Sequence, residues 1–290
     1  MNDNVASLLI ALTLLSLPGC DSPSDPPLEK ETTAEPEQLP VADDADKEEQ
    51  VRAAMLAVGG KFLNRRSLNL THSSITDDML PQLEMLTGLQ LLDLTGTKIT
   101  DAGLEHVNAL TTLKGLGLAD TQVTDAGLPH INKLTSLGSL YLNNTRISNA
   151  GLEKLKEFAL LGLLNLTGTL ITDDGLQHLK ELASLKTLVL LSTEITDGGL
   201  EHLAALTDLQ ILNVDGTQIT DAGLEHLKGH KNLRLLDLSN TQITDAGLKH
   251  LKPLTNLENL YMEGTEVTEA GFAELRAAFP ECQVYSEAVE

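Results

Sequence analysis

A five-residue motif, Thr-Asp-Ala-Gly-Leu, recurs through most of this chain at spacings of 24 residues or multiples of 24. Identical copies occupy residues 100–104, 124–128, 220–224 and 244–248, and variants begin at Thr76, Ser148, Thr172, Thr196 and Thr268. A fixed period of this length indicates one structural unit stacked upon itself. The chain is therefore predicted to be an elongated repeat array, which does not enclose a single buried active site.

The residues of one unit predict a short strand followed by a helix. Leu92 and Leu94 lie two positions apart, so both side chains point to the same side of a strand. Parallel pairing with the next strand needs a crossover, which residues 101–110 supply as a helix capped by Thr100 or Asp101. The helix buries an apolar stripe at a spacing of three residues, namely Leu104, Val107 and Leu110.

Two further columns are predicted to be structural. Thr97 and its copies line the turn after each strand, where the hydroxyl binds otherwise unpaired backbone groups. Gly103 and its copies allow the start of each helix to approach its neighbour closely. The acidic residue at Asp101 and its copies is interpreted as a helix cap.

Residues 89–99 read Leu-x-x-Leu-x-Leu-x-x-Thr-x-Ile, and the pattern recurs in each unit. This resembles the leucine-rich-repeat family, whose pattern is Leu-x-x-Leu-x-Leu-x-x-Asn-x-Leu, with Thr here in place of Asn. The resemblance implies an α/β fold: a right-handed leucine-rich-repeat solenoid, or horseshoe, with a parallel β-sheet on the concave face and short helices on the convex face. Nine units are expected to span residues 65–279.

The array needs covers at both ends, because the terminal units would otherwise expose their apolar layers. Residues 46–64 are predicted to form the N-terminal cap, with a helix at 47–58 that stops at Gly59-Gly60. Its buried positions are expected to be Val51, Ala54, Met55 and Val58. Arg65 stands where the other units have Leu, which suits a cap. Residues 280–290 are predicted to form a final edge strand and a tail, since Val284 falls 24 residues after Leu260.

The first 45 residues differ in composition from the array. Residues 5–17 form an apolar run that is shorter than the ~20 residues of a membrane span and is typical of a secretion signal. The run ends in Leu17-Pro18-Gly19-Cys20, which resembles the lipobox of bacterial lipoproteins and implies a signal peptide of residues 1–20 with lipid on the Cys20 thiol. The absence of Lys and Arg from residues 1–4, and Pro18, depart from that pattern and leave an uncleaved anchor or a misassigned start as alternatives. Residues 21–45 are predicted to be a disordered acidic linker.

Charge and cysteine content exclude some classes of function. The formal net charge of −22 is spread along the chain, so a basic nucleic-acid footprint is absent and nucleic acid is not an expected partner. The two cysteines, Cys20 and Cys282, do not make a disulfide framework, and Cys282 is interpreted as a cap residue.

No catalytic, metal or cofactor motif is found, and the chain is not expected to be an enzyme. A histidine column occurs at 106, 130, 178, 202, 226 and 250, but one imidazole per helix cannot converge on one ion when adjacent helices lie about 8–10 Å apart. His230 replaces a leucine of the repeat. Either its ring is tucked against a helix end, or it is a pH-sensitive weak point.

The outward residues of the concave sheet are expected to carry the function, because core packing does not specify them. An exposed apolar patch is predicted near the middle, made of Leu163, Val189, Leu191, Ile211 and Leu235. Tyr141 and Tyr261 are expected to flank it about 25 Å apart. The predicted partner-binding residues are Asp93, Tyr141, Leu163, Asn165, Val189, Leu191, Ile211, Asn213, Leu235, Asp237 and Tyr261.

These features favour a membrane-tethered, monomeric lipoprotein of the bacterial cell envelope, which binds a protein or an extended peptide on its concave face. Two alternatives from other classes are an envelope structural or glycan-binding protein, and an adaptor similar to the F-box leucine-rich-repeat proteins, although no F-box resemblance is present in residues 1–60. No cofactor is expected. Neither the partner nor the cellular process can be deduced from the residues.

Overall fold

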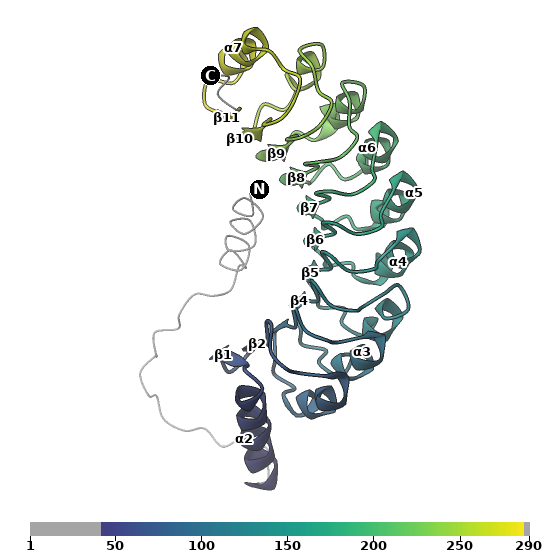
Figure 1. Cartoon of the computed structure of the whole chain (residues 1–290), viewed down its shortest axis with the longest axis vertical. Coiled ribbons are helices and arrows are strands. Elements are labelled where there is room, and N and C mark those ends of the chain that lie inside the picture. The colour runs from purple at the N-terminus through teal and green to yellow at the C-terminus, as the bar shows by residue number, and fades with distance from the viewer. Residues whose placement is uncertain (1–41, 287–290) are drawn as a thin grey trace, which may run out of the picture. The chain divides into compact units, whose positions relative to one another are not determined.

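The computed structural model describes residues 42–286, which belong to one compact unit that begins at Ala42. The predicted signal peptide, Cys20 and residues 21–41 of the predicted linker lie outside the described residues, as do 287–290. The described part is an arc of strands on the inner side and short helices on the outer side (Figure 1). This is the leucine-rich-repeat solenoid that the family resemblance implied.

A single 11-stranded sheet runs through the described residues, with its strands in chain order. The strands are β1 (Lys61–Asn64), β2 (Ser67–Asn69), β3 (Leu91–Asp93), β4 (Gly115–Gly117), β5 (Ser139–Tyr141), β6 (Leu163–Asn165), β7 (Thr187–Val189), β8 (Ile211–Asn213), β9 (Leu235–Asp237), β10 (Asn259–Tyr261) and β11 (Gln283–Tyr285). β1 and β2 form an antiparallel hairpin, and every later pair is parallel. From β2 to β11 each strand residue pairs with the one 24 positions away, as Leu92 does with Leu116. The spatial period is therefore the period of the sequence.

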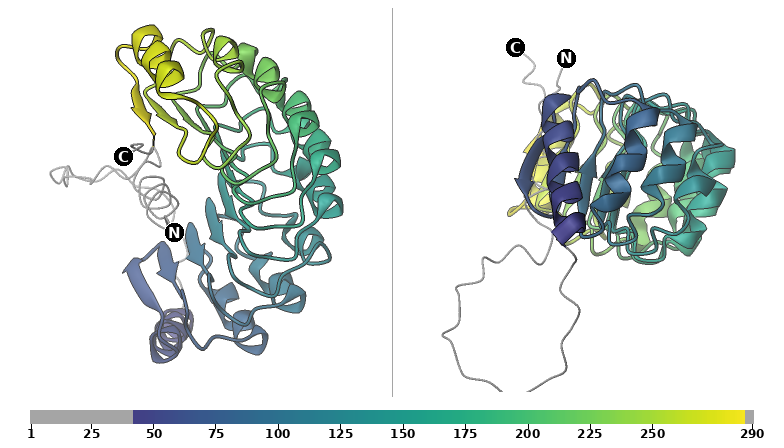
Figure 2. Two further views of the ribbon diagram at one scale, coloured as in Figure 1. Left: turned by 45° about the horizontal axis from the view of Figure 1, so that its top comes forward. Right: turned by 90° about the horizontal axis from the view of Figure 1, so that it is seen from below.

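Short helices connect the strands on the convex side, as the two views of Figure 2 also show. The α-helices are α2 (Ala42–Ala57), α3 (Asp101–Val107), α4 (Asn149–Leu152), α5 (Asp173–Leu176), α6 (Asp197–Leu203) and α7 (Glu269–Ala278). The 3₁₀ helices are η1 (Asp77–Met85), η2 (Leu128–Ile131), η3 (Glu153–Glu157), η4 (Gln177–Glu181), η5 (Gly223–Gly229) and η6 (Leu248–His250). The predicted helix over residues 101–110 is too long, because α3 ends at Val107 and the Leu110 N–H closes a tighter turn onto the Val107 carbonyl at 3.0 Å.

Threonine or serine hydroxyls, and not aspartates, cap α3, α4, α6 and α7. The Thr100 hydroxyl accepts a hydrogen bond from the N–H of Ala102, two residues into α3. Asp101 instead reaches the next repeat, where its carboxylate accepts from the Thr124 N–H at 2.7 Å and from the Thr124 hydroxyl at 2.7 Å. The interpretation of the acidic column as a set of helix caps is therefore wrong. In an isolated helix, the only backbone N–H groups near this aspartate are those of its own helix. In the stacked array, the next repeat supplies the N–H of Thr124.

The glycine column is explained by the same contact. A Cβ built on Gly127 would collide with Oδ1 of Asp101, and the glycines at 103, 151, 175, 199, 223, 247 and 271 meet the preceding repeat in the same way. The prediction that these glycines permit close approach is confirmed. The Thr97 column is also as predicted, since its hydroxyl donates to the Leu94 carbonyl at 2.6 Å inside the turn.

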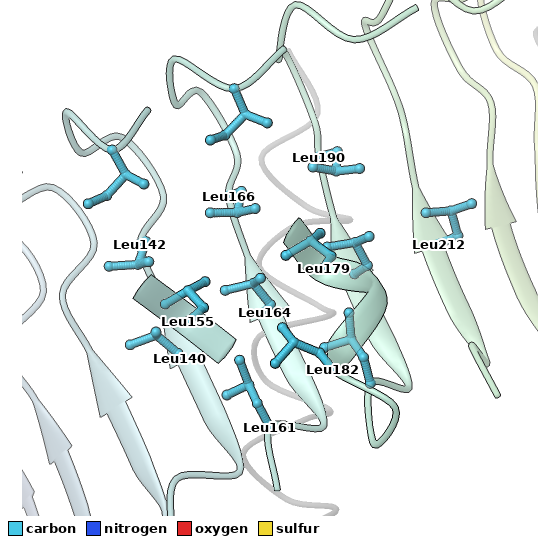
Figure 3. Close-up of a cluster of buried hydrophobic side chains, with 14 of the residues drawn as sticks. Leu140, Leu142, Leu155, Leu161, Leu164, Leu166, Leu179, Leu182, Leu190 and Leu212 are labelled. Carbon is cyan, nitrogen blue, oxygen red and sulfur yellow. The ribbon is translucent and has the colours of Figure 1, made fainter. Parts of the chain in front are cut away.

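The core is one continuous column of leucine and isoleucine along the whole array. Each layer contributes strand and helix residues, such as Leu164, Leu166 and Leu179, all fully buried (Figure 3). Burying one such side chain contributes roughly 1.5–3 kcal/mol. Each layer is covered by apolar layers on both sides. A single repeat alone would expose its apolar side chains to water.

α2 precedes the first repeat and β11 follows the last one. α2 begins at Ala42, so residues 42–45 belong to the cap helix and not to the linker. Val51 and Met55 are buried against the first repeats, with Ala54 and Val58 packed beside them. At the other end β11 extends the sheet in register, with Val284 opposite Leu260. None of the helices in residues 42–286 has the length and apolar character needed to cross a membrane.

Candidate functional site

The concave face consists of three columns of outward residues that alternate with the core leucines. One column starts each strand, the second ends it, and the third lies two residues further on. Register places equivalent residues side by side, so that Leu163 lies beside Thr187, and Thr187 beside Ile211. The predicted columns are therefore present, and the eleven predicted partner-binding residues all lie on them.

The apolar patch is less exposed than the sequence predicted. Leu163 and Val189 are 7% and 6% exposed, so the expectation that they are exposed is wrong. Leu191, Ile211 and Leu235 are half-buried. Parallel strands lie about 4.8 Å apart, and at this spacing neighbouring side chains on a concave face cover one another. The patch is a closely packed apolar floor with three partly open leucine and isoleucine side chains.

The polar residues that end the strands accept hydrogen bonds from the backbone of the following turn. Asn165 Oδ1 accepts from the Thr167 N–H at 3.0 Å, and Asn213 Oδ1 accepts from the Asp215 N–H at 2.9 Å. Asp93 makes the same contact with the Thr95 N–H at 3.0 Å. Short Asn and Asp side chains often bind the backbone two residues on in this way. These side chains hold the turn after the strand, which the sequence analysis did not anticipate, although their place before the turn could have suggested it.

Asp237 is a buried carboxylate on this face, and its pKa is raised. It is 3% exposed, accepts from the Ser239 N–H at 3.0 Å, and accepts from Nδ2 of Asn213 at 2.9 Å. Burial raises the pKa of Asp237 to about 6, with smaller contributions from the carboxylates of Asp215 and Glu263, while hydrogen bonds to Ser239 oppose the rise. The C-terminal part of the concave face is therefore acidic and changes its charge near neutral pH.

Tyr261 and Tyr285 form a stacked pair beside this acidic region. Their ring centroids lie 4.4 Å apart and their planes differ by 4°. Burial raises the pKa of the Tyr261 hydroxyl, and Tyr285 and the nearby carboxylates raise it further. Tyr261 thus packs against the C-terminal cap, and Tyr141 is the tyrosine that borders the apolar floor. The final strand was predicted from the sequence, whereas the contact of Tyr285 with Tyr261 was not.

Two of the convex histidines contact a carboxylate of the preceding repeat. His106 contacts Glu84 at 3.0 Å, and His130 approaches Glu105 at 3.8 Å. Within residues 42–286 no group of three or more His, Cys, Asp or Glu side chains is arranged to hold an ion.

His230 is a core residue. The ring is fully buried, and Nε2 donates to the Leu203 carbonyl at 3.1 Å, whereas Nδ1 is buried without a partner. This geometry fits the neutral tautomer with its proton on Nε2. Burial accordingly lowers the pKa of His230, and its hydrogen bonds to backbone oppose that shift. The ring lies against the helix of the preceding repeat, as the first of the two interpretations predicted.

Comparison with known proteins agrees with this geometry. Two leucine-rich-repeat family models match, one over residues 207–267 and the other over residues 87–106. The repeating strand, turn and helix, with the concave sheet that they build, give this chain the fold of a leucine-rich-repeat solenoid. Solenoids of this kind generally bind their partners on the extended concave surface. No curated protein matches the sequence.

Among solved structures, internalin C2 of Listeria monocytogenes is similar, with 26% identity and a TM-score of 0.58 over 81% of this chain and 91% of that one. A leucine-rich-repeat protein of Leptospira interrogans has 18% identity and a TM-score of 0.46 over 70% of this chain and 62% of that one. A second Listeria monocytogenes internalin has 18% identity and a TM-score of 0.32, over 86% of this chain and 96% of that one.

Proposed function

We propose that the chain is a membrane-tethered lipoprotein that binds a partner protein, or an extended peptide of one, on the concave face of its array. The observation that carries this proposal is the apolar floor of strands β6 to β9. There Leu191, Ile211 and Leu235 are only half-buried. The inward leucines of the same layers, Leu188, Leu212 and Leu236, are fully buried. A partner side chain on this floor would complete the burial.

The chemistry of the floor suits a protein partner. Removing apolar surface from water contributes about 25 cal/mol per Å². Binding interfaces combine a central aromatic or aliphatic anchor with a polar rim. Tyr141 on β5 borders the floor, and the carboxylates of Asp215 and Asp237 lie at its β8–β9 end. We therefore expect a partner segment with an apolar centre and a basic residue toward its β9 end.

The proposed membrane tether is supported by the sequence alone. Cys20 follows an apolar run, and the acidic stretch up to α2 would self-repel and hold the array away from a bilayer. Mass spectrometry of the mature N-terminus in the membrane fraction tests this part. An acylated Cys20 supports it, and an intact Met1 contradicts it.

The concave site is tested by capture of the partner with full-length bait. Leu191→Asp with Ile211→Asp would put two carboxylates on the floor, and we expect loss of the captured protein. The matched control is Leu160→Asp with Leu170→Asp, at two leucines that are 61% and 60% exposed and lie outside the outward columns. Capture that survives the first pair as well as the second would show that the concave site is wrong.

The glycan-binding and adaptor alternatives gain no support from the geometry. Sugar rings stack on free aromatic faces, and one face of Tyr261 is already covered by Tyr285. Isothermal titration with cell-wall fragments remains the experiment that separates glycan binding from protein binding.

A further inference from the structure

A small basic pocket lies at the N-terminal end of the array, away from the concave floor. Its volume is about 180 Å³, and three segments line it: α2, the turn between β1 and β2, and the loop after η1. The lining residues are Glu48, Arg52, Arg65, Arg66, Leu86, Thr87, Gly88 and Leu89. Leu86 and Leu89 are buried and belong to the core, so the pocket has an apolar base and a rim of guanidinium groups.

One of the three arginines is already neutralised. Nε and Nη2 of Arg52 both donate to Oε1 of Glu48, at 2.9 and 2.7 Å. The Arg52 guanidinium also lies 4.6 Å from the ring centroid of Phe62 and is mostly buried. Glu48 is the single acidic residue of the lining, and it is already paired with Arg52. The charges of Arg65 and Arg66 are therefore not compensated within the pocket.

The backbone that carries these two arginines is held in place. Arg52 donates from Nη2 to the Arg65 carbonyl at 3.0 Å, and the Arg66 N–H donates to Oδ1 of Asn64 at 2.7 Å. The Arg66 carbonyl accepts from the N–H groups of Gln90 and Leu91, at 2.7 and 3.0 Å. Both side chains are exposed above this pinned turn. A site whose main chain is ordered before binding loses less entropy when a ligand arrives.

The segment that contains the two arginines is basic, whereas the chain as a whole is acidic. The sequence contains 42 acidic and 20 basic residues, yet residues 61–66, Lys-Phe-Leu-Asn-Arg-Arg, contain three bases and no acid. Arg65 also occupies the column in which the following repeats bury a leucine, such as Leu89 and Leu113. End capping requires a polar residue there, but it does not require two adjacent arginines facing a cavity. Their mutual repulsion is relieved when an anion binds between them.

We propose that this pocket is a binding site for a phosphate group, with Arg65 and Arg66 as its ligands and Arg52 as the support of the turn. A guanidinium presents its N–H donors in a planar fork that matches two oxygens of a phosphate. The pocket admits one such group and no large ligand. Two sources share this chemistry: a free phosphate or phosphate monoester, and the phosphate of a lipid headgroup.

Calorimetric titration of the full chain with inorganic phosphate at low ionic strength tests the site. Arg65→Ala with Arg66→Ala should weaken binding by at least about tenfold, and Arg65→Lys with Arg66→Lys should give an intermediate loss, because the charge remains without the fork. The control is Lys98→Ala with Arg146→Ala, which removes the same charge from two exposed positions in other repeats and should leave the affinity unchanged. Thermal unfolding of each variant checks that the cap is intact.

A second measurement distinguishes the sources. Co-sedimentation of the full chain with phosphatidylglycerol vesicles, against phosphatidylcholine vesicles, should fall in the double alanine variant if the ligand is a lipid headgroup, and should not change if it is a free anion. Equal phosphate affinity in the native chain and the double alanine variant would overturn the proposal, as would no binding of phosphate by the native chain. Neither result depends on the concave site, so this inference can fail without affecting the proposed function.

Discussion

The carboxylate of Asp101 binds Thr124 twice, through the backbone N–H and the side-chain hydroxyl, and so joins two consecutive repeats. The same Thr124 hydroxyl accepts from the N–H of Ala126 and starts the next helical turn. One threonine thus links its own helix to the repeat before it. Equivalent bridges connect Asp77 to Thr100, Asp125 to Ser148, Asp173 to Thr196, Asp197 to Thr220, Asp221 to Thr244 and Asp245 to Thr268.

Asp101→Ala should destabilise the array by about 1–3 kcal/mol, because it removes two hydrogen bonds and leaves a partly buried N–H unpaired. Urea unfolding followed by circular dichroism measures the change. Asp208→Ala, at an exposed aspartate outside the column, should change the free energy of unfolding by less than about 0.5 kcal/mol. Equal effects of the two substitutions would contradict the bridge.

Asn149→Asp should stabilise the protein by about 1 kcal/mol. Asn149 is the one amide in the column, and its Nδ2 donates to the Thr172 hydroxyl at 2.8 Å. Thr172 then makes no cap bond to its own helix, unlike Thr196. A carboxylate would accept from the Thr172 hydroxyl and leave its oxygen free to cap α5. A lower urea midpoint for this variant would show that the amide is not the cause of the missing cap.

Gly127→Ala should be strongly destabilising for its size, because the new Cβ would collide with the bridging oxygen of Asp101. We expect a loss of about 1–3 kcal/mol. Gly229→Ala is the matched control, since a Cβ there would meet nothing within 4 Å and φ is not in the left-handed region. That variant should be neutral or slightly stabilising, and thermal unfolding of both proteins makes the comparison.

His230→Leu should remove one source of acid instability. The pKa of His230 is lowered in the folded protein below its ordinary value of 6.5, so the unfolded chain binds the proton more readily. The contribution of this group to stability is therefore complete above pH 6.5 and declines as the pH falls below it, by at most about 1.4 kcal/mol per pH unit. The gap between variant and native protein should widen on acidification, and a constant gap from pH 7.5 to 5 would contradict the assignment.

Asp237 should titrate near pH 6, as its raised pKa indicates. Because the folded pKa exceeds the ordinary value of 3.8, this group binds protons more readily in the folded protein, and its contribution to stability increases as the pH falls from about 6 toward 4. Its effect is thus opposite in sign to that of His230. Carboxyl-carbon NMR of the native protein gives the midpoint directly, and a value close to 4 would show that the carboxylate is better solvated than its burial implies.

The period of the sequence determined most of the architecture. Leucines at 24-residue intervals can be buried only if equivalent strands lie side by side, and the two caps follow from the need to cover the last layers. Gly103 and Thr97 were also predictable, because each has one role in any stacked unit of this kind. The position of the concave face followed from the alternation of inward and outward residues.

The tertiary structure decided which neighbour each polar group meets. Asp101 has a partner 23 residues away that an isolated helix does not possess, so its role was misread as a cap. Leu163, Val189 and Asp237 are outward by alternation but buried by the strands on either side, and Tyr261 found Tyr285 only through the pairing of β10 with β11. The burial of a side chain depends on its neighbours in space. The sequence period specifies that a neighbour exists on each adjacent strand, but not how much of an outward side chain that neighbour covers.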